Sequence, residues 1–155
     1  MRSLLLDANI LVLLIVGGVD RASILLHKRT RNFVQADYDL LVATIAGYDG
    51  LVVTTSVLTE ASNLLAYTND SLRERLLAAL GRFIGAVSEQ RPESASVVSE
   101  QIFVRLGLTD AGLMTCVRAG HSFLTTDLDL YLAAVEISQN AINFNHLRQS
   151  SLSGR

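Results

Sequence analysis

Four acidic residues stand where an apolar strand is expected to end or a helix to begin: Asp7, Glu60, Asp110 and Asp127. A carboxylate that follows a buried segment lowers stability unless it is solvated or paired. Carboxylate oxygens are the ligands that Mg²⁺ and Mn²⁺ prefer, and metal-assisted hydrolysis of a phosphodiester typically needs several of them. A single Asp at a strand end is more often a helix cap. Because four occur in one chain, they predict one metal site assembled by folding.

Apolar strands that alternate with helices are the elements that must position these carboxylates. The sequence predicts strands at 4–6, 51–55, 122–126 and 141–144. It predicts helices at 9–18, 20–33, 36–48, 70–86, 93–106 and 129–137, with two more carrying Glu60 and Asp110. Such alternation gives right-handed βαβ units and a mostly parallel sheet between two helical layers. We therefore expect a three-layer α/β fold with the acidic site at the C-terminal ends of the strands.

The helix caps of the predicted site follow from the residues just before each carboxylate. Thr55 or Ser56 can cap the helix that carries Glu60, and Thr109 is placed to cap the helix that begins at Asp110. A capped helix whose first turns carry an acid directs that carboxylate to the same edge of the sheet as the strand ends.

Length and composition are those of one globular domain. The chain has 155 residues, of which 50% are hydrophobic and 18% charged. We expect a single domain at 1–148 and a flexible C-terminal tail at 149–155. The single cysteine excludes an intramolecular disulfide and a thiolate zinc cluster, and it fits a reducing, cytoplasmic location. The formal charge of −2 argues against a strongly basic nucleic-acid binder, but not against a metal-dependent nuclease.

The segments around the four carboxylates resemble, in order, the motifs of the PIN domain family, which includes the VapC-type toxins. They read Leu-Leu-Asp7-Ala-Asn9-Ile-Leu-Val, Ser-Val-Leu-Thr-Glu60-Ala, Leu-Gly-Leu-Thr-Asp110-Ala and Leu-Thr125-Thr-Asp127-Leu-Asp129-Leu. The resemblance covers residues 3 to about 147. It implies a PIN-like fold in which the matching acids Asp7, Glu60, Asp110 and Asp127 bind Mg²⁺ or Mn²⁺ and support endoribonuclease activity. It also implies a homodimer and, for a toxin, an antitoxin protein.

Three residues near the acids keep two interpretations each. By resemblance, Asn9 matches the small polar residue that helps orient the first Asp, and Thr125 matches the hydroxyl often found two positions before the last Asp. Both side chains could instead cap backbone amides. Asp129 could approach the metal or cap the helix that follows it. The chain is longer than a compact VapC-type toxin, and the additional length lies between Gly18 and Gly50.

The additional length contains a basic cluster, defined here as Lys28, Arg29 and Arg31. Its members could contact RNA phosphates, because Lys and Arg supply most of the phosphate affinity of nucleic-acid-binding proteins. They could equally form a solvated surface. His121 precedes the strand that ends at Asp127, so we expect it at the opposite end of the sheet, in a structural role.

Competing functions are less well matched by the residues. A catalytically weak PIN-like module that binds RNA or a protein is the main alternative to the nuclease. Haloacid-dehalogenase-type phosphatases and receiver domains also place an Asp after the first strand, but they rely on a lysine after a later strand. Lys28 is the only lysine of this chain and lies early in it. No glycine-rich nucleotide loop and no Gly-x-Ser-x-Gly elbow occurs.

Overall fold

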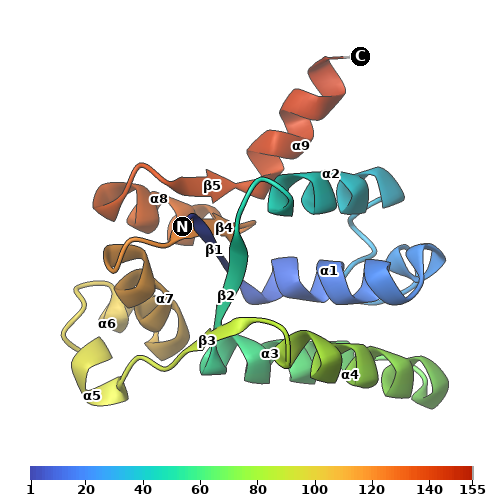
Figure 1. Cartoon of the computed structure of the whole chain (residues 1–155), viewed down its shortest axis with the longest axis horizontal. Coiled ribbons are helices and arrows are strands. Elements are labelled where there is room, and N and C mark those ends of the chain that lie inside the picture. Colours follow the sequence, from blue (N-terminus) through green and yellow to red (C-terminus); the bar gives the residue numbers. More distant parts are fainter. Residues whose placement is uncertain (155) are drawn as a thin grey trace.

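A computed structural model, which describes residues 1–154, contains a five-stranded sheet in the order β3-β2-β1-β4-β5. Its strands are β1 (Ser3–Leu6), β2 (Gly50–Thr54), β3 (Ser88–Gln90), β4 (Ser122–Thr125) and β5 (Ala141–Asn143). All neighbouring strands pair in parallel, and helices flank the sheet (Figure 1). The predicted three-layer α/β fold with a parallel sheet is therefore confirmed.

Nine α-helices and one short 3₁₀ helix connect the strands in residues 1–154. The α-helices are α1 (Ala8–Val19), α2 (Gln35–Ile45), α3 (Thr55–Leu65), α4 (Asp70–Ile84), α5 (Ser94–Val97), α6 (Phe103–Leu106), α7 (Leu108–Arg118), α8 (Leu128–Ile137) and α9 (Phe144–Ser153). Helix α1 packs against α2, α3 and α4, and α7 packs against α5, α6 and α8. No helix in this part of the chain is long and apolar enough to cross a bilayer.

The core is centred on β1 and β4, whose apolar side chains are buried because helices cover both faces of the sheet. Leu4, Leu5 and Leu6 have no exposed surface, and neither have Phe123 and Leu124 in β4. Burial on both faces explains why these strands are continuous apolar runs with no alternating pattern.

The order of the strands reverses beside β1. The chain runs from β1 to β2 and β3 on one side, and then crosses to β4 and β5 on the other. Open parallel sheets bind ligands just outside the carboxyl ends of the strands at such a switch point. Here the strands on either side of it, β1 and β4, are followed by Asp7 and Asp127.

Segment 20–33 is not the α-helix that the sequence predicted. Only Arg21–Ile24 is helical, as the 3₁₀ helix η1, and turns follow up to Phe33. Side chains here form hydrogen bonds with backbone groups that would pair with each other in an α-helix. The Thr30 hydroxyl donates to the Ile24 carbonyl, and the Arg29 N–H donates to His27 Nδ1. Local bonds of this kind compete with helix formation.

The sequence also misjudged one helix and missed one strand. Segment 93–106 forms the short helices α5 and α6 joined by turns, in place of one helix. Strand β3 was not predicted, because its sequence Ser-Glu-Gln is polar and gives no apolar signal. It is an edge strand paired to β2 alone, and an edge position tolerates polar residues.

The C-terminal segment 149–155, expected as a tail, continues a helix as far as Ser153. Helix α9 is capped by Asn143, whose Oδ1 accepts a hydrogen bond from the Asn145 N–H. Arg148 fixes its first turns by donating to the Asp37 carboxylate and to the Asn32 carbonyl. The helix projects from the body of the domain (Figure 1). Arg155 lies outside the described residues.

Candidate functional site

Asp7 is a buried carboxylate at the C-terminal end of β1. It caps α1, and its Oδ1 accepts a hydrogen bond from the Ala8 N–H at 2.7 Å. Its Oδ2 accepts one from the Thr125 hydroxyl, also at 2.7 Å. Only 7% of the residue is exposed. Two charge-assisted hydrogen bonds offset part of the cost of burying the anion, and they fix its orientation at the sheet edge.

Thr125 joins the ends of β1 and β4 across the switch point. Its hydroxyl donates to Asp7 and at the same time accepts the Asp127 N–H at 3.0 Å. The threonine is fully buried, so this hydroxyl is shielded from competing water. The sequence left two roles open for Thr125, a hydrogen bond to the acidic site or a cap of a backbone amide. The hydroxyl makes both contacts, one with the Asp7 carboxylate and one with the Asp127 N–H.

Asp127, Asp129 and Asn9 occupy helix starts at this edge. Asp127 is exposed and caps α8 by accepting the Leu130 N–H at 3.0 Å, which leaves its other oxygen outside this cap. Asp129 is exposed in the first turn of α8. Asn9 is exposed at the second position of α1, and the hydrogen-bond partners of the Asp7 carboxylate are Ala8 and Thr125, not Asn9.

Glu60 and Asp110 approach the same edge from α3 and α7. Thr54, and not Thr55 or Ser56, caps α3 by accepting the Val57 N–H. Helix α7 begins after Gly107, whose φ of 91° lies in the region that favours glycine, so the expected cap at Thr109 is wrong.

Glu60 and Asp110 both line one groove of about 730 Å³ between α3 and the start of α7. Asp7 and Asp127 are not part of this lining. The groove therefore opens onto two of the four predicted acids, while the other two lie beside it at the strand ends.

The charges that act on Asp110 indicate that the four carboxyl groups lie in one region. Burial, followed by the negative charges of Asp7, Asp127 and Glu60, raises the pKa of Asp110 to about 6. Burial of its carboxyl and the charge of Asp7 also raise the pKa of Glu60, although the residue as a whole is exposed. Burial is the largest cause that raises the pKa of Asp7, against the hydrogen bonds from Thr125 and Ala8.

The ion pairs in residues 1–154 do not neutralise these acids. The pairs are Arg21 with Asp39, Arg91 with Glu89, Arg118 with Glu100 and Arg148 with Asp37. A set of converging carboxylates without cationic partners matches the donors of a hard divalent cation. In the same residues, however, no three His, Cys, Asp or Glu side chains lie close enough together to hold a metal ion as they stand. The donor chemistry fits, and a closer approach of the side chains is required.

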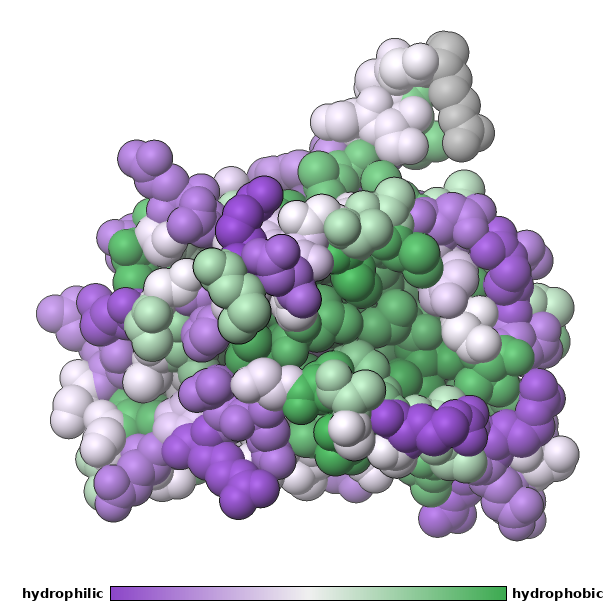
Figure 2. Space-filling view, in the orientation of Figure 1, coloured by the Kyte–Doolittle hydropathy of each residue, from purple (hydrophilic) through white to green (hydrophobic). Residues whose placement is uncertain are grey.

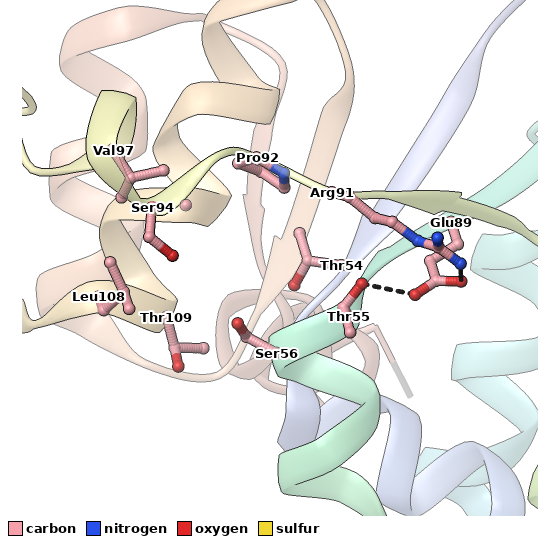
Figure 3. A pocket seen from close by; sticks show the side chains of 11 residues that line it. Thr54, Thr55, Ser56, Glu89, Arg91, Pro92, Ser94, Val97, Leu108 and Thr109 are labelled. Atoms are coloured by element: carbon pink, nitrogen blue, oxygen red, sulfur yellow. Dashed lines mark hydrogen bonds and ion pairs between the residues drawn. The ribbon is translucent and has the colours of Figure 1, made fainter.

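A second hollow of about 400 Å³ adjoins the groove and shares Thr55, Ser56, Leu108 and Thr109 with it. Hydroxyl groups from the start of α3 and from Ser94 and Thr109 gather around it (Figure 3). The Thr55 hydroxyl donates to Glu89, which also pairs with Arg91 at 3.0 Å. The sequence indicated Thr55, Ser56 and Thr109 only as helix caps, because Ser and Thr at helix starts ordinarily have that role.

The members of the basic cluster lie in different surroundings. All three side chains are exposed. Lys28 Nζ and Arg29 Cζ lie 5.7 Å and 5.5 Å from the centre of the Tyr67 ring. Arg29 also lines the groove, and its charge opposes the rise in the pKa of Glu60. Arg31 is not in the groove lining.

His121 and His27 both contact groups of the surrounding fold. Nδ1 of His121 lies 2.6 Å from the hydroxyl of Ser3, at the N-terminal ends of β4 and β1 and far from the acids along both strands. That position confirms the expected one. His27 is buried, with Nε2 3.4 Å from the Leu65 carbonyl oxygen.

Comparison with known proteins adds no relative. Neither a scan of protein-family models nor a search of curated proteins finds a match to this chain. The fold and the four carboxyl groups at the edge of the sheet are therefore the basis for assigning a function.

The raised pKa of Asp110 predicts how the metal-free protein responds to pH. A carboxyl pKa that is raised from 3.8 to about 6 on folding stabilises the protein below about pH 4, and this stabilisation is lost as the pH rises through about 6. Asp110→Asn removes the titrating group. In EDTA, the free energy of unfolding of the variant relative to the native chain should therefore increase between about pH 4.5 and pH 8. We expect about 1–2 kcal/mol after allowing for solvent screening.

Urea denaturation at the two pH values measures this difference. Asp70→Asn serves as the control, because Asp70 is an exposed acid in the first turn of α4. Equal pH dependence in the Asp110 variant and the native chain would show that Asp110 is not crowded by the other acids.

Proposed function

We propose that this chain is a metal-dependent endoribonuclease of the PIN type that hydrolyses RNA phosphodiester bonds. The observation that carries the proposal is the placement of four carboxyl groups, none of them in an ion pair of residues 1–154, around the C-terminal strand ends at the switch point of a parallel sheet. Asp7, Glu60, Asp110 and Asp127 would hold Mg²⁺ or Mn²⁺. When bound, such an ion lowers the pKa of a coordinated water and offsets charge that develops on the phosphate.

The residues of the chain supply orientation. The Thr125 hydroxyl and the Ala8 N–H fix the two oxygens of Asp7, and the Leu130 N–H fixes one oxygen of Asp127. Glu60 and Asp110 face the groove through which a nucleic-acid strand reaches the acids. No side-chain nucleophile is required. Cys116 does not supply one, because burial raises the pKa of its thiol to about 11.

A toxin with an antitoxin partner is the biological setting that we propose, together with a homodimer. Support for the dimer comes from apolar side chains gathered over the centre and right of the face in Figure 2. Between α1 and α4, a shallow hollow is lined by Leu14, Ile15 and Val19 with Arg75 and Arg82 at its side. Exposed apolar surface rimmed by polar groups is typical of protein interfaces.

A catalytically weak module that binds RNA or a protein is the second candidate. It is favoured by one observation: in residues 1–154 no three potential ligands stand at metal-binding distance. The two candidates differ in whether the carboxylates close around a cation.

Metal removal should abolish cleavage and lower stability. We expect the purified protein to cut single-stranded RNA in Mg²⁺ or Mn²⁺ and to lose this activity in EDTA, because without a cation the acids repel the phosphate. A metal held only by the folded state also raises the melting temperature. Gel analysis of a labelled RNA and a thermal titration with Mn²⁺ measure the two effects.

EDTA saturated beforehand with Mn²⁺ is the control, since it adds the same anion without chelation. Full activity in metal-free EDTA would refute the metal mechanism. An absence of cleavage together with an unchanged melting temperature over a broad Mn²⁺ range would favour the binding module.

A further inference from the structure

The groove that holds Glu60 and Asp110 continues past the acids to an exposed aromatic ring. Its lining passes along α3 from Glu60 through Asn63 and Leu64 to Tyr67, with Arg29 beside the ring. Seven residues of helical rise span about 10 Å, so the ring lies roughly two turns from Glu60. A strand with its reacting phosphate at the acids therefore passes Tyr67 within a short distance of the cleaved bond.

Tyr67 is positioned as a platform. It follows α3, which ends at Leu65, and its N–H donates to the Leu64 carbonyl oxygen at 3.3 Å. The backbone is thus held, yet 56% of the residue is exposed. A tyrosine offers a rigid ring with few rotatable bonds, and aromatic side chains of this kind stack the bases of single-stranded nucleic acids.

Two cations of the basic cluster lie over the Tyr67 ring. Lys28 and Arg29 come from the turns before α2, and both cations lie within 6 Å of the ring centre. Arg29 is also close enough to Glu60 for its charge to oppose the rise in the pKa of that carboxyl. Cations next to an aromatic face and along a groove match the alternation of phosphate and base in a single strand. An apolar peptide would find no such match.

We propose that Tyr67 stacks one base of a single-stranded RNA next to the cleavage site while Arg29 contacts the adjoining phosphate. This inference rests on the proposed function for its substrate class and adds a subsite to it. Tyr67 is a positioning residue: it holds the nucleotide beside the reacting one and touches none of the reacting atoms. The subsite is tolerant of sequence, because every base has a face that can stack.

Binding of a short fluorescein-labelled single-stranded RNA is followed by anisotropy in Ca²⁺, a hard cation that offsets the charge of the acids, and the RNA is recovered intact afterwards, so the test does not depend on cleavage. Tyr67→Leu, which keeps bulk and loses the ring, should weaken binding roughly 5- to 100-fold. Tyr67→Phe and Tyr67→Trp should retain affinity. Tyr48→Ala is the matched control, because Arg2 lies 5.0 Å from that ring and Tyr48 precedes β2, at the opposite edge of the sheet.

An RNA series that carries one abasic residue at successive positions separates stacking from a structural role. The native protein should lose affinity when the abasic residue reaches the subsite, whereas Tyr67→Leu should be insensitive to its position. A variant that had only lost rigidity would keep the positional sensitivity. Arg29→Gln should lower the slope of log affinity against log salt by about one, and Arg31→Gln should leave the slope unchanged.

The outcomes are separable from those of the nuclease proposal. Loss of affinity in Tyr67→Leu with retention in Tyr67→Trp supports the subsite even if EDTA does not affect cleavage. Equal RNA affinity in Tyr67→Leu, Tyr48→Ala and the native chain would overturn it, as would a total lack of RNA binding. If no RNA binding were found at all, a protein would be the better candidate for the ligand of the groove.

Discussion

Asp7→Asn should slow RNA cleavage by at least about 100-fold while leaving the fold intact. Even residues that only support metal ligands cost about 10- to 100-fold in metal affinity or activity when they are replaced, so a ligand should cost no less. The amide has nearly the same shape as the carboxylate but lacks its charge. Because burial already raises the pKa of Asp7, removal of that charge should not destabilise the metal-free protein.

Rates of cleavage and the melting temperature with and without Mn²⁺ measure both parts of this prediction. The native chain should be stabilised by Mn²⁺, and the variant should not. Asp70→Asn is the control, since that exposed acid lies in the first turn of α4 and is not one of the four acids. If Asp7→Asn retained native cleavage and native stabilisation by Mn²⁺, the assignment of Asp7 as a ligand would be wrong.

The sequence predicted those elements whose apolar pattern is set by the core. Strands β1, β2 and β4 were found because a strand covered on both faces must be apolar throughout. Strand β5 was predicted as well, although it lies at the edge of the sheet. Strand β3 was missed because it is polar and lies at the edge. Segment 20–33 was misread because the side chains of Thr30 and His27 bond to backbone atoms, and composition does not reveal such contacts.

The candidate site was predictable in its members but not in its spacing. A parallel sheet brings its C-terminal strand ends to one edge, so Asp7 and Asp127 had to meet there. The distances among the four acids also depend on where the helices begin. The start of α7, which carries Asp110, follows Gly107 with its positive φ. Tyr67 gave no signal, because a single tyrosine after a helix has no motif; only its position beside Arg29 and the groove marks it.

Thr125→Val should lower the free energy of unfolding by about 1–3 kcal/mol, because two hydrogen bonds share one hydroxyl. The Asp7 carboxylate loses a donor and the Asp127 N–H loses its acceptor, and a group left unsatisfied in a buried site costs about this amount. The bond from Thr125 also lowers the pKa of Asp7, so its loss should raise that pKa further and disfavour the charged form that binds metal. Cleavage at neutral pH should therefore decrease as well.

Thr125→Ser should restore both properties, because serine keeps the hydroxyl on the same backbone. Thr44→Val is the matched control: that hydroxyl donates to the Leu40 carbonyl within α2 at 2.8 Å, and loss of such a bond inside a helix has little effect. Urea denaturation and cleavage rates over a range of pH measure the outcome. The higher pKa of Asp7 in Thr125→Val should shift the acidic limb of the pH profile upward. A profile identical to that of the native chain would show that the hydroxyl holds the two strand ends together without influencing the charge of Asp7.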